Sequence, residues 1–270
     1  MAERAESVWL GPVRKPMRVV MLASTAGVGL LAIWLIAGRL FFGSGIGLKQ
    51  FLSPADTPSV LLTMIFGAVA LFSASVYFAD RRGPIEPQPA GFFDFVSLVF
   101  SRLAMIATAA CVIVMFYEVV SRYLFVKPTL WANELSLWIA GFIFLFAGLY
   151  AMQQRSHIRI YIIYDLMPRW MQKLSDIVSV LLIWVFAFLL VWGGYNEAVD
   201  KFLRWETFGT AWDPPLPATI KPAILIMVVL VAIQALSNLI ADWDKAPEHH
   251  SPLDEIDESE IEQMRQSIKD

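Results

Sequence analysis

The sequence contains six long apolar runs, and this pattern restricts the chain to one fold class. Each run has the ~20 residues that an α-helix needs to cross the hydrocarbon core of a bilayer. A backbone in lipid must satisfy its own hydrogen bonds, and no run alternates as barrel strands do. The predicted spans are residues 18–38, 58–78, 103–120, 131–152, 177–194 and 220–241. We therefore expect an all-α integral membrane protein with about six transmembrane helices.

The composition agrees with a membrane location. Hydrophobic residues make up 57% of the chain and charged residues 17%, against about 45–50% and about 25% in soluble proteins. The net charge is −3 and no basic stripe is visible, which argues against binding to nucleic acid. Most classes of soluble enzyme are excluded.

The distribution of lysine and arginine predicts the orientation. With the N-terminus in the cytoplasm, 14 of the 21 basic residues fall in cytoplasmic segments and 7 in outer ones. Cytoplasmic loops carry the excess of Lys and Arg in membrane proteins. Both termini are therefore predicted to be cytoplasmic.

A segment rich in proline and glycine divides the chain. Residues 80–91 contain three prolines, two glycines and two adjacent arginines, a composition typical of an extended linker. The predicted units are a two-helix hairpin (1–79), the cytoplasmic linker (80–91), a four-helix membrane domain (92–243) and an acidic, solvated tail (244–270).

Two stretches are predicted to lie along the membrane surface. Residues 92–100 are rich in aromatic residues and precede the third span. Residues 167–174 form an amphipathic pattern, because Asp165, Arg169 and Lys173 recur every four positions while Trp170 points elsewhere. An ordinary polar loop is the alternative for this second stretch.

The residue inventory argues against an enzyme. The chain has three histidines and one cysteine, Cys111, which lies in an apolar run. It shows no pair of histidines for haem inside the spans, no cysteine cluster, no phosphate-binding loop and no nucleophile–base motif. We expect no catalytic residue, no metal site and no cofactor.

Charged residues near the ends of the spans are the best candidates for a role, since such groups are costly in a membrane. Glu118 and Arg122 are four residues apart and are expected to pair on one helix face. Trp131, Glu134 and Trp138 share a face of the next span. Glu134 either interacts with the helix dipole beside an aromatic belt or makes a contact between helices or subunits.

Two further groups lie between spans. Arg155, His157 and Arg159 follow the fourth span, and they either form a functional patch or only contribute positive charge on the cytoplasmic side. The loop before the sixth span is predicted to be stiff and anchored in the membrane interface. Its notable residues are Arg204, Trp205, Glu206, Thr210, Trp212, Asp213, Pro214, Pro215 and Lys221.

Together these residues resemble a known family. Residues 92–243 are similar to the small membrane subunit of the tripartite ATP-independent periplasmic (TRAP) transporters, of the DctQ or SiaQ type. The first matching motif comprises Glu118, Arg122, Tyr123, Phe125, Pro128, Trp131, Glu134, Leu135 and Ser136. The second comprises His157, Ile158, Arg159, Tyr164, Pro168 and Arg169, and the third Glu206, Thr210, Trp212, Pro214, Pro215 and Lys221.

The resemblance implies a part in transport. Such a subunit works with a large membrane subunit (M type) and a periplasmic substrate-binding protein, in sodium-coupled uptake of an organic acid or a related solute across the bacterial inner membrane. The small subunit braces the large one and holds neither the substrate nor the sodium sites. The N-terminal hairpin is additional to the common four-helix form.

The polar residues suggest how a brace could be built. We expect Glu118, Arg122, Trp131 and Glu134 to fix the third and fourth spans and the contact with the partner. Two other classes stay open: a membrane anchor subunit of another complex, and an autonomous six-helix carrier or channel. The transported substrate cannot be read from this chain.

Overall fold

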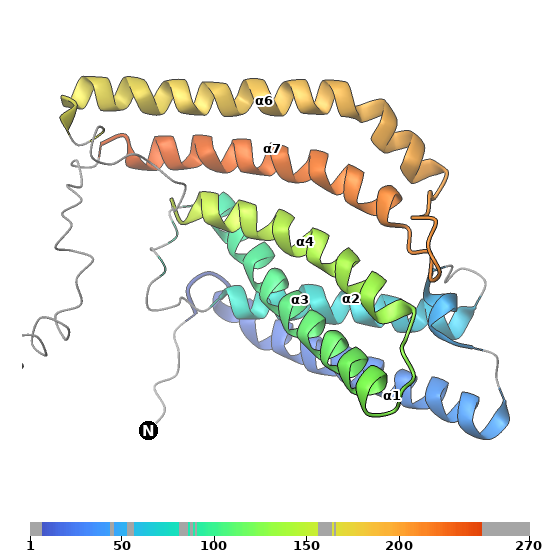
Figure 1. The fold of residues 1–270 in the computed structure, drawn as a ribbon. Coiled ribbons are helices and arrows are strands. Elements are labelled where there is room, and N and C mark those ends of the chain that lie inside the picture. Colours follow the sequence, from blue (N-terminus) through green and yellow to red (C-terminus); the bar gives the residue numbers. More distant parts are fainter. Residues whose placement is uncertain are drawn as a thin grey trace, which may run out of the picture.

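Six long helices make up most of the computed structural model, which describes residues 7–43, 46–52, 57–80, 86, 89, 91–155, 164 and 166–244 (Figure 1). They are α1 (Arg14–Phe42), α2 (Pro58–Ala79), α3 (Phe92–Tyr123), α4 (Trp131–Gln153), α6 (Arg169–Leu203) and α7 (Leu216–Asp242). Two short 3₁₀ helices are also present: η1 (Gly11–Val13) precedes α1, and η2 (Leu48–Leu52) lies between α1 and α2. All six long helices are long and apolar enough to cross a membrane, which confirms the predicted all-α fold.

Successive helices run in opposite directions, so the bundle has two ends (Figure 1). The end that we call the near end, on the left in Figure 1, holds the starts of α1, α3 and α6 and the ends of α2, α4 and α7. The opposite end, which we call the far end, lies on the right in Figure 1 and holds the turn between α3 and α4 and the loop between α6 and α7. The helices are packed as neighbours in the order α1, α2, α3, α4, α7, α6. The α1–α2 hairpin therefore contacts the rest of the protein mainly where α2 packs on α3.

This arrangement leaves most of the apolar surface uncovered. In every span at most 28% of the most apolar window is buried within the protein. Large side chains such as Trp34, Phe144 and Trp192 are 70%, 78% and 77% exposed. Outward-facing apolar side chains of this kind are stable in lipid or against another membrane protein.

The structure corrects the prediction of a separate interfacial helix at residues 167–174. Residues from Arg169 onward belong to α6, which continues without interruption to Leu203. Its 35 residues span about 52 Å, more than the ~30 Å hydrocarbon core. Pro168 occupies the N-cap, and no glycine or proline follows until Gly193, so nothing separates the amphipathic turns from the span. Residues 92–100 are likewise the first turns of α3.

Gly27 allows α1 and α2 to pack closely. A Cβ atom added to Gly27 of α1 would lie 2.5 Å from the Phe66 ring of α2, so only glycine fits there without rearrangement. The buried hydroxyls of Ser73 and Ser75 donate to carbonyls four residues earlier, at 2.6 and 2.8 Å. Polar side chains in the hairpin are thus satisfied within their own helix.

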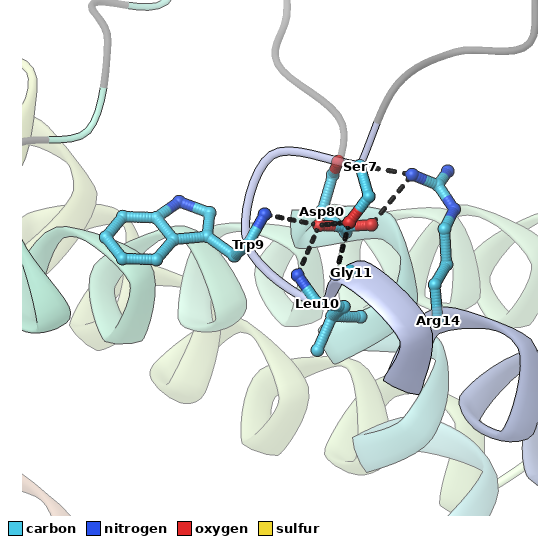
Figure 2. A network of polar contacts seen from close by, with 6 residues as sticks. All are labelled: Ser7, Trp9, Leu10, Gly11, Arg14 and Asp80. Atoms are coloured by element: carbon cyan, nitrogen blue, oxygen red, sulfur yellow. Dashed lines mark hydrogen bonds and ion pairs between the residues drawn. The ribbon is translucent and has the colours of Figure 1, made fainter.

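A buried carboxylate fixes the chain start to the hairpin (Figure 2). Asp80 follows α2 and is 0% exposed. It accepts the backbone N–H groups of Trp9 and Leu10 at 2.8 and 2.9 Å, the Ser7 hydroxyl at 3.0 Å and the Arg14 guanidinium at 2.7 Å. The two N–H donors lie just before η1, and Arg14 is the first residue of α1, so Asp80 ties the segment that leads into α1 to the end of α2.

Candidate functional site: the far-end clasp

Most of the residues singled out in the sequence gather at the far end, where they join helices to loops. We use the name far-end clasp for Glu118, Arg122, Thr129, Trp131, Glu134, Trp138, Thr219 and the loop residues bonded to Glu134. Glu118 of α3 is 3% exposed. Its Oε1 atom accepts Nε and Nη2 of Arg122 at 2.9 and 2.5 Å, which confirms the expected pair. Its Oε2 atom accepts the backbone N–H of Thr129 at 3.0 Å and also the Thr129 hydroxyl. One carboxylate thereby ties the end of α3 to the turn before α4.

Thr129 was not singled out in the sequence. Its position between Pro128 and the start of α4 gives a weak signal, because threonine is common just before a helix. Trp131, two residues further on, stacks in a tilted arrangement on Tyr117 of α3, with 5.6 Å between ring centroids. The turn between α3 and α4 is therefore held by polar bonds and by an aromatic contact.

Glu134 joins the start of α4 to the loop between α6 and α7. Its Oε2 atom accepts the Thr210 hydroxyl at 2.7 Å and the backbone N–H groups of Trp212 and Asp213 at 3.2 and 3.1 Å. This is a contact between elements of the same chain. The residues it joins are 76 to 79 positions apart.

Trp138 extends the same connection one turn deeper into the bundle. Its indole Nε1 donates to the hydroxyl of Thr219 in α7 at 2.8 Å. Thr219 in turn donates to the carbonyl of Pro215 at 2.8 Å. A Cβ atom on Gly141 of α4 would lie 2.9 Å from Ile220, so α4 and α7 approach closely here.

The loop held by Glu134 is tightly wound. Trp205, Gly209 and Asp213 have positive φ angles of 47°, 80° and 63°. Asp213 tolerates this conformation because its side chain accepts the Gly209 N–H at 2.6 Å. That backbone N–H, the Thr207 hydroxyl and the nearby Lys49 charge lower the pKa of Asp213 despite partial desolvation. The carboxylate form therefore stabilises the loop.

Trp212 and the double proline lie inside the protein. We expected the loop to be anchored in the membrane interface, but Trp212 is 8% exposed and Pro214 and Pro215 are less than 2% exposed. The backbone bonds to Glu134 draw Trp212 against the bundle. Among the described residues its Nε1 atom has no hydrogen-bond partner. Trp205 remains partly exposed and donates to the Leu52 carbonyl at 3.4 Å, which links the loop to the hairpin.

Two ion pairs complete the far end. Lys221 of α7 pairs with Glu197 of α6, and Lys201 of α6 pairs with Glu206 in the loop. The hydrogen bond from Lys201 lowers the pKa of Glu206 more than desolvation raises it. Lys221 was predicted as a site residue without its partner, because a pairing across 24 positions depends on which helices are neighbours.

The third predicted group is described in part. His157 and Arg159 lie outside the described residues. Arg155 has a left-handed backbone with φ of 56° and pairs with Asp242 at the end of α7, where its Nη2 atom lies 2.9 Å from Oδ1. This pair ties the end of α4 to the end of α7.

A buried polar cluster at the near end was missed in the sequence. Gln234 of α7 is 1% exposed. Its Oε1 accepts the Ser97 hydroxyl at 2.7 Å, and its Nε2 donates to Asp94 at 2.6 Å and to Asn238 at 2.9 Å. Asn238 donates to the Met152 carbonyl of α4 at 2.6 Å. A glutamine inside an apolar run is the signal that could have indicated this link.

The linker also contributes one buried anchor. Glu86 is 5% exposed and accepts Arg102 of α3 at 2.6 Å and the Tyr150 hydroxyl of α4 at 3.0 Å. The described polar groups at both ends thus mainly form hydrogen bonds and ion pairs that connect different helices. They hold the row of helices in fixed register.

These features define a multi-pass membrane protein whose polar residues serve a rigid helical scaffold. Residues 111–245 match the family described as tripartite ATP-independent periplasmic transporters, DctQ component. The match covers half of the chain and includes the far-end clasp, and the chain belongs to this family. The α1–α2 hairpin lies outside the matched region. No curated protein and no solved structure matches the chain.

Proposed function

We propose that this protein braces the large membrane subunit of a TRAP transporter in the bacterial inner membrane. One observation carries the proposal: six helices stand in a row fixed by polar ties at both ends, while most apolar side chains face outward. A row with fixed ends and uncovered faces is suited to packing against a larger membrane protein. Membership of the DctQ family supports the same role.

Within this role the far-end clasp positions the bracing surface. Glu118, Arg122, Trp131 and Glu134 set the geometry of α3, α4 and the α6–α7 loop through the bonds described above. A brace needs such preset ends because a sliding partner would otherwise deform it. Sodium coupling and substrate binding are assigned to the large subunit, and capture of an organic acid to the periplasmic binding protein.

The proposed topology places the near end in the cytoplasm. The near end carries Arg14, Lys15, Arg18, Arg155 and Lys173, in keeping with the excess of basic residues in cytoplasmic segments. The far-end clasp then faces the periplasm, on the side where the binding protein delivers its substrate. We propose the same division of the chain at residues 80–91 as the sequence predicts.

Reconstitution into liposomes tests the role. The chain, a large TRAP membrane subunit from the same organism and its binding protein are combined in turn, and uptake driven by a sodium gradient is measured with labelled candidate organic acids. We expect uptake when all three are present and none with the chain alone. Full uptake without this chain would contradict the bracing role. Uptake by the chain alone would favour an autonomous carrier.

A further inference from the structure

A groove between α6 and α7 at the near end is not explained by the bracing role. It has a volume of about 510 Å³ and receives residues from α4, α6 and α7. Its deeper part is apolar and includes Val180, Ile183, Phe186, Val228 and Val231. A volume of several hundred cubic ångströms is typical of a small-molecule or lipid site.

The mouth of the groove is polar and carries three basic residues. Arg155, Arg169 and Lys173 line it together with the carboxylates of Asp176 and Asp242, which leaves one net positive charge. Arg155 uses Nε and Nη2 for Asp242, and its Nη1 atom carries two further N–H groups.

The other two basic residues are fixed on the first turns of α6. Lys173 lies over the indole of Trp243, 4.5 Å from the ring centroid, and Arg169 donates to Gln172 at 3.3 Å. Lysine held beside a tryptophan at the end of an apolar helix is typical of the headgroup level of a membrane.

The depth of the groove matches one leaflet. From Asp176 at its mouth to Phe186 at its base are ten residues of helix, or about 15 Å. Half of a ~30 Å hydrocarbon core is the same length. The depth of the groove therefore fits an acyl chain that extends from the headgroup level to the middle of the membrane.

A second groove between the same two helices lacks the charged mouth. It has a volume of about 580 Å³, and its lining, which includes Val191, Phe202 and Ile226, contains no charged residue. The combination of an apolar shaft with a basic mouth therefore distinguishes the near-end groove from the other groove between α6 and α7.

We propose that the near-end groove binds one anionic phospholipid. Its phosphate lies among Arg155, Arg169 and Lys173, and one acyl chain lies along Val180, Ile183 and Val231. Basic pockets between transmembrane helices on the cytoplasmic side are known to bind such headgroups. The inference does not depend on the bracing role, and of the proposed function it uses only the placement of the near end in the cytoplasm.

Lipid retention by the full chain tests the proposal. The protein is purified in mild detergent and titrated with phosphatidylglycerol or phosphatidylcholine, and bound lipid is counted by native mass spectrometry. We expect one phosphatidylglycerol per chain, weaker retention of phosphatidylcholine and no displacement by inorganic phosphate. The Arg169→Gln/Lys173→Gln double variant should weaken phosphatidylglycerol binding about tenfold or more.

Matched variants separate the groove from general effects. Lys15→Gln/Arg18→Gln removes the same charge from exposed positions at the near end of α1 and should leave binding unchanged. Ile183→Trp fills the proposed acyl site and should reduce binding, whereas Ile226→Trp in the second groove should not.

Four results would overturn the proposal. They are equal retention of both lipids, equal losses in the two double variants, displacement by inorganic phosphate, and lipid binding that appears only after removal of residues 245–270 or of a bound large subunit. The third would indicate an anion site without an acyl chain. The fourth would assign the groove to the acidic tail or to the partner. The result of the liposome uptake experiment, which tests the bracing role, does not depend on any of these four results.

Discussion

The carboxylate of Glu134 accepts the backbone N–H of Trp212 at 3.2 Å, and this contact joins the first turn of α4 to the loop that precedes α7. Since α4 also packs on α3, the contact lies at the centre of the row of helices. The polar contacts on either side, Glu118 with Thr129 and Trp138 with Thr219, make the far end one connected unit.

Loss of the Glu134 carboxylate should release the loop. Glu134→Ala removes three hydrogen bonds to a charged acceptor, each worth about 1.5–3 kcal/mol. We expect cleavage of residues 204–215 by chymotrypsin to become at least tenfold faster and the melting temperature in detergent to fall. Glu197→Ala is the matched control, because its carboxylate is 60% exposed and its pair with Lys221 contributes little. Equal cleavage of the Glu134 variant and wild type would contradict the clasp.

Thr129 should be needed for its hydroxyl and not for its shape. Thr129→Val keeps the volume but removes a hydroxyl that donates to the buried Glu118 carboxylate, at an expected cost of about 1.5–3 kcal/mol. Thr129→Ser keeps the hydroxyl and should stay close to wild type. Thermal unfolding in detergent compares the two. Indistinguishable melting temperatures for the two variants would show that the hydroxyl does not stabilise the turn.

Acid should detach the start of the chain from the hairpin. Burial raises the pKa of Asp80, but the bonds from Leu10, Trp9, Ser7 and Arg14 outweigh it, and the folded-state pKa lies below the ordinary value of 3.8. A lowered pKa means that the ionised form stabilises the fold. This contribution is complete above pH 3.8 and is lost as the pH falls through the folded-state value.

Hydrogen exchange at the Trp9 and Leu10 amides measures this detachment. Protection, corrected for intrinsic exchange, should be constant from neutral pH down to about pH 5 and should fall below about pH 4. Asp80→Asn should have lower protection at neutral pH and a flat profile. Asp213→Asn, at the other end of the bundle, should keep the wild-type profile. A wild-type profile in the Asp80 variant would disprove the link.

The buried glutamine at the near end should show a non-additive effect. Gln234→Leu leaves Ser97 without its acceptor and removes one donor to Asp94, and an unsatisfied buried polar group costs about 1–3 kcal/mol. Adding Ser97→Ala to this variant removes the orphaned hydroxyl. The double variant should therefore be no less stable than Gln234→Leu alone when thermal unfolding is compared. Fully additive losses would show that the two side chains act independently.

Sequence patterns predicted the features of this protein that are local. Hydropathy located all six spans, because each span depends only on its own composition. The Glu118–Arg122 pair followed from a spacing of four on one helix. The helix ends were less accurate, since α3 and α6 extend well beyond the apolar runs that predicted them.

The remaining contacts depend on which helices are neighbours. Glu134 with Trp212, Gln234 with Ser97 and Asp80 with Ser7 join residues 78, 137 and 73 positions apart. The period of an apolar face shows which side of a helix is buried, but it does not give the order of the helices in the row. Polar residues such as Gln234 and Asp80 could be noticed as costly in or beside a membrane, while their partners could not be identified.

Purification of the tagged chain from its native membrane tests the central claim most directly. The chain is extracted in mild detergent, and the proteins retained with it are identified and quantified by mass spectrometry. The account predicts one much larger multi-span membrane protein in equimolar amount, retained through size-exclusion chromatography. A chain that is reproducibly monodisperse without such a partner would contradict the bracing role.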